Sequence, residues 1–592
     1  MNGRRLGARA EEPQPGWWTH PALPRLLLVL VTILGVTALA YLAGPPLPFR
    51  VGQVHTRDLR VREYFELVNQ EKTEQARDDA VHRLSAELRD DPLAREEARR
   101  GVDPVIEQYP AGKILVPRGV PISERQYALL LEEHRAYQAS LGPRDLLRRA
   151  VSLFLIMALL ATLIVFYVAR FETELAVSTR KITVLGATVL LTVGLCLLLS
   201  NTPMEGSLIP LTVTAMVLTI AYNPMFALVV SFSMALATRV ALGVDQSQLL
   251  IQVAGVATAV LLLRNLRTRT RLVEVSAAAG LAYLAMTVAA GLLNDESWSI
   301  ISFDAVRNFA CGTLAGFLLA GSLPLVERCF GVITDISLTE LADGSHPLLK
   351  ELLRRAPGTY THSMMVAHLA EAASEAIGAN PLLARVGSSF HDIGKMLKPQ
   401  YFIENQTGEN RHDSLEPGLS TLIIINHVKD GVALAKQHNL PQPLVDFIEQ
   451  HHGTTLVEYF YHEAVRQREL AGHGDGELES SFRYPGPKPQ YREIGVVMLA
   501  DAVESTSRAL SDPNPNSLRK LVHDLLMKRL LDGQFEESGL TLSELHLIEE
   551  SLYKSLVALF HARIKYPERE PEKPREKERS AKATAVAPSS GQ

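Results

Sequence analysis

The feature that most constrains this chain is a series of long apolar runs. Between about residues 148 and 329 charged residues nearly vanish, while the flanking regions carry the charge of ordinary soluble domains. A helix crosses the roughly 30 Å hydrocarbon core of a bilayer with about 20 apolar residues. One run, Leu26–Gly44, precedes this region, and seven lie within it: 150–169, 182–200, 206–222, 225–243, 247–263, 273–293 and 304–326. The sequence therefore predicts a helical protein that crosses a membrane eight times.

Composition supports this division. The chain has 592 residues, of which 47% are hydrophobic and 21% charged, with a net charge of −5. This length predicts several domains, and the uneven hydropathy excludes a wholly cytosolic enzyme, a fibrous chain and a mostly disordered one. The charge balance gives no sign of a nucleic acid polymer as a partner. Cys196, Cys311 and Cys329 lack CxxC neighbours, which argues against a disulfide framework or a zinc finger.

The first run reads as an uncleaved signal anchor rather than a signal peptide. It is long, and no clean cleavage site precedes the Pro-rich segment that begins at Gly44. Eight spans place both termini on one side of the membrane, and clustered arginines and lysines choose the cytoplasmic side. Clusters before the first span, after the second span and at 264–271 fall on that side, whereas those at 144–149 run against the trend. We therefore expect a multi-pass protein of the cell (inner) membrane with cytoplasmic termini.

The expected organisation has six parts. These are a cytoplasmic N-terminus at 1–25, a transmembrane anchor at 26–44, an extracytoplasmic domain at 45–147, a seven-transmembrane domain at 148–329, a cytoplasmic domain at 330–566 and a disordered tail at 567–592. The 45–147 segment carries helical patterns and no defensible nucleophile–base pair, so a sensor-like, mainly helical domain for an unknown ligand is expected. Apolar residues recur at helical spacing through 330–566, which predicts an all-α domain. The fold class is therefore all-α throughout.

A few charged residues occur inside the predicted spans. Arg239, Glu274, Asp304 and Arg307 all lie near predicted span ends. Snorkelling to the interface explains them better than an ion pathway. No row of acids crosses the middle of a span, so a transporter is the least favoured reading.

Histidine and aspartate residues gather in the cytoplasmic domain. The set comprises His362, His391, Asp392, His427, His451, His452 and Asp501. Each lies on or at the end of a predicted helix, and a helical bundle can bring such residues to a common centre. Imidazole and carboxylate ligands suit Fe, Mn, Zn or Ni. Seven ligands are too many for one ion and about right for two, with one carboxylate bridging.

The segment Phe390-His-Asp-Ile-Gly-Lys395 resembles the core motif of HD-domain metal phosphohydrolases. Further segments resemble the PgpH-type branch, the membrane-bound seven-transmembrane HD hydrolases. They are Thr361-His-Ser363, Ile377-Gly-Ala-Asn380, Arg385-Val-Gly387, Tyr401-Phe-Ile-Glu-Asn-Gln406, His451-His-Gly-Thr454, Phe482-Arg-Tyr-Pro-Gly-Pro-Lys-Pro489 and Met498-Leu-Ala-Asp501. The resemblance covers nearly the whole chain, from the anchor through the extracytoplasmic domain and seven spans to the HD domain.

The resemblance implies hydrolysis of cyclic di-AMP to pApA at a centre of two divalent metal ions, Fe or Mn. Carried over by motif, one metal is held by His362, His391, Asp392 and Asp501. The other is held by His427, His451 and His452, with Asp392 bridging. Two metals about 3.5–4 Å apart can hold a water and lower its pKa toward neutrality. Asp392 and Lys395 are the expected catalytic residues: Lys395 follows Asp392 by one turn and either binds phosphate, supports the bridging carboxylate or is merely solvated.

Two alternatives stay open at this point. One is an HD phosphohydrolase with another substrate, such as cyclic di-GMP or a mononucleotide, because the metal ligands would be the same. The Gly-Tyr-Pro motif that marks the cyclic di-GMP branch is missing after His452. The other is a receptor that binds nucleotide without cleaving it, although a complete ligand set weighs against this. The oligomeric state is also open, with a homodimer as one alternative, and the membrane part is expected to regulate the enzyme.

Overall fold

The computed structural model describes residues 22–561, apart from 46, 48, 55–56, 86–87, 89, 201–205, 244–245, 264–265, 471–478 and 511–512. The arginines at 4, 5 and 9 and the expected disordered tail lie outside the described residues. The chain divides into two compact units, the first ending at Asp343 and the second beginning at Gly344. Helices dominate both units, and the all-α prediction is confirmed.

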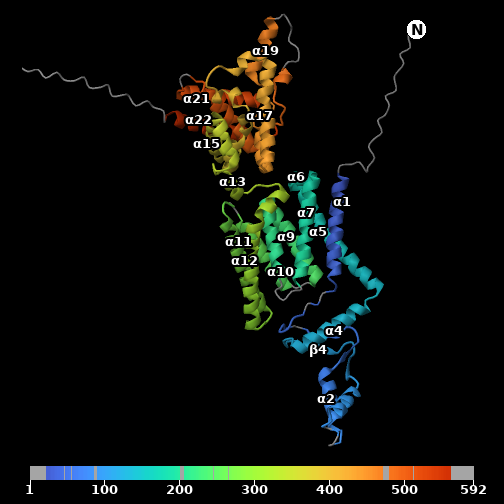
Figure 1. Ribbon diagram of the computed structural model, residues 1–592. Coiled ribbons are helices and arrows are strands. Elements are labelled where there is room, and N and C mark those ends of the chain that lie inside the picture. Colours follow the sequence, from blue (N-terminus) through green and yellow to red (C-terminus); the bar gives the residue numbers. More distant parts are fainter. Residues whose placement is uncertain are drawn as a thin grey trace, which may run out of the picture. The chain divides into compact units, whose positions relative to one another are not determined.

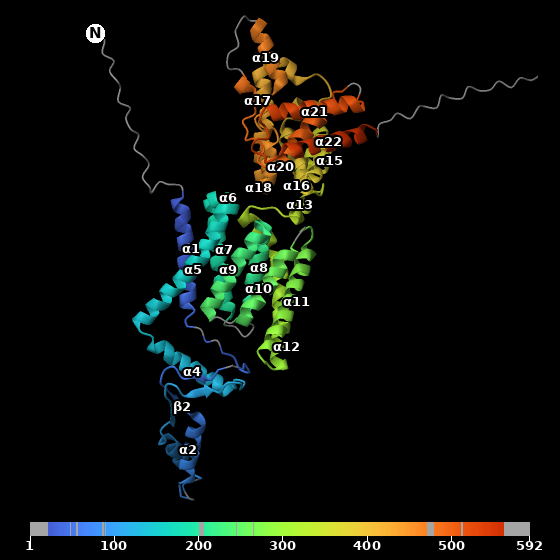
Figure 2. The same ribbon diagram turned by 180° about the vertical axis from the view of Figure 1, so that it is seen from behind.

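Within its described residues, the first unit contains eight apolar helices at the predicted places. Six are long and apolar enough to cross a membrane: α1 (Leu23–Leu42), α5 (Pro143–Phe171), α7 (Thr179–Ser200), α9 (Pro224–Leu242), α11 (Arg269–Leu293) and α12 (Trp298–Phe330). Two are shorter, α8 (Leu208–Ala221) and α10 (Gln246–Leu262). Figures 1 and 2 show α7 to α12 running side by side. The chain is a multi-pass membrane protein, and α12 extends beyond the predicted 304–326 at both ends.

Small residues allow these helices to approach closely. A Cβ atom added to Gly312 of α12 would lie 2.6 Å from the Cα atom of Gly280 in α11. A Cβ atom on Gly280 would lie 2.7 Å from the carbonyl oxygen of Phe309. Glycine at helix crossings permits such backbone contact, which is a common way for helices to pack in membranes. The α11–α12 hairpin therefore depends on these two glycines.

Between α1 and α5 lies the inserted domain, residues 45–147. It contains three helices, α2 (Gln70–His82), α3 (Pro92–Arg100) and α4 (Glu124–Ser140). It also contains four short strands that the sequence analysis did not predict: β1 (Leu59–Arg60), β2 (Phe65–Val68), β3 (Ile106–Tyr109) and β4 (Ile114–Val116). β1 pairs with β4 and β2 with β3, both antiparallel. Strands of two to four residues are too short to give a clear alternating pattern.

The second unit is a helical domain. Its α-helices are α14 (Pro347–Arg355), α15 (Pro357–Ala376), α16 (Pro381–Phe390), α17 (Pro417–Gln437), α18 (Gln442–Gln450), α19 (Glu458–Leu470), α20 (Arg492–Ser507), α21 (Pro515–Leu531) and α22 (Leu542–His561). Short 3₁₀ helices η2 (Ile393–Leu397), η3 (Pro399–Tyr401), η4 (Ile403–Asn405) and η5 (Arg411–Ser414) link α16 to α17, and η6 (Glu479–Phe482) precedes α20. The main core packs α15, α16 and α20 against α21 and α22, and Figure 2 shows α15, α20, α21 and α22 together. α20 is buried along most of its length, so its side chains reach the centre of the domain.

Candidate metal centre

The structure brings all seven sequence-predicted His and Asp residues to one place in the second unit. They come from five points in the chain: His362 on α15, His391 and Asp392 between α16 and η2, His427 on α17, His451 and His452 directly after α18, and Asp501 on α20. His362, His391, Asp392, His427 and His451 are almost fully buried. Because the unit is a bundle, residues more than a hundred positions apart converge without any local sequence signal between them.

The seven residues form two groups. In one group, ligand atoms of Asp392, His427, His451 and His452 lie within 4.8 Å of one another. In the other group, ligand atoms of His362, His391 and Asp501 do the same. This division matches the two-metal assignment implied by the family resemblance.

Asp392 stands between the groups, and its two oxygens face different partners. Oδ2 lies 3.2 Å from Nε2 of His391 and 3.5 Å from Nε2 of His362. Oδ1 lies 3.4 Å from Nε2 of His427 and 3.7 Å from Nε2 of His451. A carboxylate with one oxygen toward each group has the arrangement that a bridging ligand needs.

The Nδ1 atoms fix the orientation of the buried imidazoles. Nδ1 of His391 donates to the carbonyl oxygen of Ser388 at 2.6 Å, and Nδ1 of His427 donates to that of Ile424 at 2.5 Å. Nδ1 of His451 donates to the carbonyl of Ile448 at 3.0 Å. A proton on Nδ1 leaves the Nε2 lone pair available for a metal.

Among the residues that the structure describes, the Nε2 atoms of His391, His427 and His451 have no hydrogen-bond partner, and neither has Oδ1 of Asp392. Oδ2 of Asp392 is paired with Lys395, and Nε2 of His362 lies 3.0 Å from Oδ1 of Asp501. A buried polar atom without a partner is costly, and four such atoms directed to one centre are explained if cations complete them. The donor set of imidazoles and carboxylates without thiolate suits Fe, Mn, Zn or Ni. The residues therefore fit the metals that an HD domain requires.

The pKa shifts of the residues at the centre also favour the binding of cations. Burial lowers the pKa of His451 to about 3, and the neighbouring His391 adds to this effect. Burial alone would raise the pKa of Asp392, but the charges of His391 and Lys395 hold it well below its usual range. Burial lowers the pKa of His362, yet hydrogen bonds to Asp501 and Glu504 raise it to about 10. The carboxylates around His362 thus favour a positive charge at this position.

The glycine of the HD motif has a steric role. A Cβ atom on Gly394 would lie 1.9 Å from the carbonyl oxygen of His427 and 2.6 Å from the backbone nitrogen of Gly431. The turn after Asp392 therefore packs directly on the backbone of α17. This contact fixes the distance between Asp392 and His427, two residues of the same ligand group.

Lys395 is not a solvated lysine. Its Nζ atom lies 2.7 Å from Oδ2 of Asp392 and 3.3 Å from Oε1 of Glu404, and its side chain is 13% exposed. Burial alone would lower the pKa of Lys395, but the charges of Asp392 and Glu404 raise it above its usual value. Lys395 therefore stays protonated and holds the Asp392 carboxylate in place.

Sequence reasoning assigned no role to Glu404, Asn405 or Glu504. The Asn405 side chain accepts hydrogen bonds from the backbone N–H groups of Gly358 and Thr359, and so caps the helix that carries His362. Glu504 accepts from Nδ1 of His362 at 2.5 Å. The sequence contained a hint of each role. Residues 404 and 405 belong to the Tyr401–Gln406 motif, and Glu504 follows Asp501 by three residues on α20, so both lie on one face of that helix.

An aromatic residue also lies against the centre. Tyr484 stacks on His452, with ring centroids 4.3 Å apart and an interplanar angle of 25°. Tyr484 belongs to the Phe482–Pro489 motif, to which the sequence analysis gave no chemical role. The stack restrains His452. Its ligand group has three histidines and one aspartate, and His452 is the most exposed of these four residues.

Comparisons with known proteins define the class. Residues 147–334 match the family described as "7TM receptor with intracellular HD hydrolase", and residues 359–506 match the HD domain family. These two stretches of the chain are therefore similar to a seven-transmembrane HD-hydrolase family and to the HD domain family. It is similar to the cyclic-di-AMP phosphodiesterase PgpH of Bacillus subtilis, with 44% identity over 292 residues, covering 48% of this chain and 40% of the relative. The resemblance to the PgpH-type branch is thereby confirmed.

The chain is also similar to a second relative, and a solved structure matches its C-terminal part in sequence. The cyclic-di-AMP phosphodiesterase PgpH of Listeria monocytogenes is 41% identical over 315 residues, which cover 53% of this chain and 43% of the relative. The crystal structure of the L. monocytogenes PgpH HD domain in complex with cyclic-di-AMP is 45% identical, covering 37% of this chain and 99% of that structure, with a TM-score of 0.35. The chain spans less than half the length of the curated relatives it matches.

Proposed function

We propose that this chain is a membrane-bound, metal-dependent phosphodiesterase that hydrolyses cyclic di-AMP to pApA. The observation that carries the proposal is the pair of ligand groups joined by Asp392, with buried Nε2 atoms directed to one centre. The similarity to two PgpH phosphodiesterases supports cyclic di-AMP as the substrate. The proposed catalytic residues are Asp392 and Lys395, and the proposed cofactors are two Fe or Mn ions.

The proposed metal ligands follow the two groups. His362, His391, Asp392 and Asp501 would hold one ion, and His427, His451 and His452 the other, with Asp392 shared. Two divalent ions at these positions supply an activated water at neutral pH and neutralise charge that develops on the phosphodiester.

Other contacts within the chain hold the proposed metal ligands in position. Lys395 holds Oδ2 of Asp392, Glu504 orients His362 through Nδ1, and backbone carbonyls orient three further histidines. A misplacement of about 1 Å at a catalytic group can cost on the order of a hundredfold in rate. These supporting contacts therefore also matter to turnover.

The test is turnover by the purified full-length protein reconstituted with Mn or Fe. Cyclic di-AMP and cyclic di-GMP are supplied separately at equal concentration, and linear products are separated by chromatography. We expect pApA to form from cyclic di-AMP much faster than any product forms from cyclic di-GMP. Equal or reversed rates would contradict the proposed substrate, and tight binding without any product would favour a nucleotide receptor.

We further propose that the inserted domain lies outside the cytoplasm and that both termini lie inside. Eight apolar helices at the predicted positions support this orientation, as do the arginines of the α10–α11 connection. Reporter fusions at residue 100 and residue 580 should report opposite sides of the membrane. Reporters on the same side would show that the number of spans is odd or that one apolar helix does not cross.

A further inference from the structure

A large cavity lies in the first unit, where the inserted domain meets the membrane helices. Its volume is about 1030 Å³, at the upper end of the roughly 300–1,000 Å³ range of small-molecule sites. Three parts of the chain line it: the segment after α1, helix α4, and the ends of α7 to α12 that face the inserted domain. The site is thus assembled from the membrane helices and the inserted domain together, within one compact unit.

The lining is unusually polar for a cavity beside membrane helices. Besides its charged groups it carries amide and hydroxyl side chains, among them Gln53, Gln248, Thr287, Asn294 and Asn308. Some of these are held by neighbours: Nδ2 of Asn308 donates to Oγ1 of Thr287 at 2.9 Å, and Nδ2 of Asn294 donates to Oγ of Ser247 at 3.0 Å. Oriented amides of this kind give specificity for a polar ligand.

Guanidinium groups outnumber carboxylates among the described lining residues. Arg50, Arg239 and Arg307 line the cavity together with Asp304 and Glu296. Asp304 serves two of the arginines: Oδ1 lies 2.8 Å from Nη1 of Arg307, and Oδ2 lies 3.9 Å from Nη1 of Arg50. The described lining thus carries three guanidinium groups and two carboxylates, a balance that favours an anionic ligand over a cationic one.

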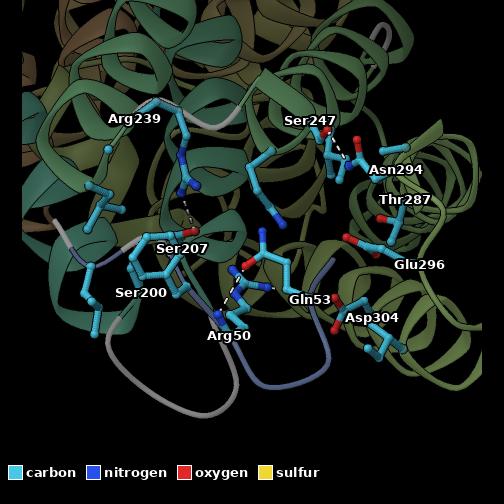
Figure 3. Close-up of a pocket in the computed structure, with 18 of the residues that line it drawn as sticks. Arg50, Gln53, Ser200, Ser207, Arg239, Ser247, Thr287, Asn294, Glu296 and Asp304 are labelled. Carbon is cyan, nitrogen blue, oxygen red and sulfur yellow. Dashed lines mark hydrogen bonds and ion pairs between the residues drawn. The ribbon is translucent and has the colours of Figure 1, made fainter. Parts of the chain in front are cut away.

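Arg239 is the most informative of these residues. The sequence analysis expected it to snorkel to the interface, but its residue surface is only 7% exposed and it faces the protein interior from the last turn of α9. Its Nη2 atom lies 3.5 Å from Oγ of Ser207. Figure 3 shows Arg239 and Ser207 on one side of the cavity, Glu296 and Asp304 on the other, and Arg50 with Gln53 between them. A charge buried this close to a membrane interior is costly and marks a functional site by default.

A second cavity shows what a lipid-type site in this unit looks like. It has a volume of about 270 Å³ and lies among α1, α5, α7 and α9. Leucine, isoleucine, valine and alanine side chains form most of its wall. Such a lining suits an acyl chain, whereas the large cavity offers guanidinium, amide and hydroxyl groups in place of that apolar wall.

We propose that the large cavity binds a small polar anion, with a carboxylate or phosphate group held by Arg239 and Arg50. Guanidinium groups recognise both anions through paired, charge-assisted hydrogen bonds. The anion is either a free solute from the side of the inserted domain or the headgroup of an anionic lipid, since the chemistry is shared. This site lies beyond the proposed hydrolytic activity, and its test measures binding, so its failure would leave the hydrolase proposal untouched.

The test uses the full-length protein in a nonionic detergent free of phosphate. Three probes are added separately: inorganic phosphate, citrate, and phosphatidylglycerol in mixed micelles at constant ionic strength. Binding is followed as a saturable rise in the thermal unfolding temperature. The variants are Arg239→Gln and Arg50→Gln, with Arg148→Gln as the matched control because Arg148 is exposed on α5 and does not line the cavity. Arg50 lies in a loop, so its variant remains informative if Arg239→Gln fails to fold.

We expect at least one probe to bind saturably to the wild type and to Arg148→Gln. The same probe should bind at least tenfold more weakly to Arg50→Gln, and also to Arg239→Gln if that variant folds. Binding of citrate or phosphate identifies a solute site, and binding of phosphatidylglycerol alone identifies a lipid-headgroup site. Either result supports the proposal. Equal affinity in wild type, Arg50→Gln and Arg148→Gln would overturn it, as would the absence of saturable binding by every probe.

Discussion

Buried polar side chains occur in both units of the chain, but their partners differ. In the membrane unit many hydroxyl groups bond to one another or to their own helix. Oγ1 of Thr192 meets Oγ1 of Thr214 at 2.7 Å, and Oγ1 of Thr212 meets the Tyr283 hydroxyl at 2.6 Å. Among the described residues of the second unit, the Nε2 atoms of three buried histidines, His391, His427 and His451, have no hydrogen-bond partner. Buried polar groups that hydrogen-bond to one another stabilise a fold. Buried polar groups that point to one centre and lack hydrogen-bond partners are instead arranged to bind a ligand.

The largest expected effect is at the residue shared by both ligand groups. Asp392→Ala should remove both metals and lower turnover of cyclic di-AMP by on the order of a thousandfold or more, because each oxygen of Asp392 serves one group. Metal content by mass spectrometry and turnover are measured together. Asp524→Ala, an exposed aspartate on α21, is the control. Retention of two metals by Asp392→Ala would show that the groups do not depend on a shared carboxylate.

A smaller effect is expected one contact away from the metals. Glu504→Gln removes the charge that orients His362, and outer contacts of this kind are worth about 10–100-fold in metal affinity. Metal competition titrations on the full-length protein measure this, with Glu375→Gln as the control because Glu375 is exposed on α15. A purely structural role for Glu504 would lower the unfolding temperature and leave metal affinity unchanged.

The backbone contact at the HD motif gives the third prediction. Gly394→Ala places a methyl group where the carbonyl oxygen of His427 lies, and overpacking typically costs about 1–3 kcal/mol. Chemical denaturation of the second unit in the full-length chain should show this loss. Gly408→Ala is the matched control, since no atom lies within 4 Å of its added Cβ. Equal stability of the two variants would mean that α17 moves away without difficulty.

The smallest effect is expected in the membrane unit. A double-mutant cycle with Thr192→Val and Thr214→Val should give a coupling near 0.6 kcal/mol, the average for hydrogen bonds between membrane helices. Turnover of cyclic di-AMP should stay unchanged in all three variants. A coupling of several kcal/mol, or a change in turnover, would break the distinction between structural polar pairs in one unit and functional ones in the other.

The same contrast explains what sequence could predict. The eight apolar helices and the His/Asp set were found because span length and the doublets at 391–392 and 451–452 are strong local patterns. The four strands of the inserted domain were missed because each is at most four residues long. Glu504 was missed because its role depends on α15 and α20 packing together. The cavity was missed because Arg50, Arg239 and Asp304 are far apart in the chain: Arg50 by itself is an ordinary loop residue, and Arg239 and Asp304 are ordinary charged residues near predicted span ends.

The two short membrane helices have a mechanical consequence. At about 1.5 Å per residue, the 14 residues of α8 and the 17 of α10 reach roughly 21 Å and 26 Å, less than the roughly 30 Å of hydrocarbon they accompany. Ser207, directly before α8, and Ser247 and Gln248, in the first turn of α10, all line the large cavity. The large cavity therefore lies at the N-terminal ends of both short helices. Because a helix shorter than the hydrocarbon thickness responds to that thickness, we expect the composition of the bilayer to act on the lining of this cavity.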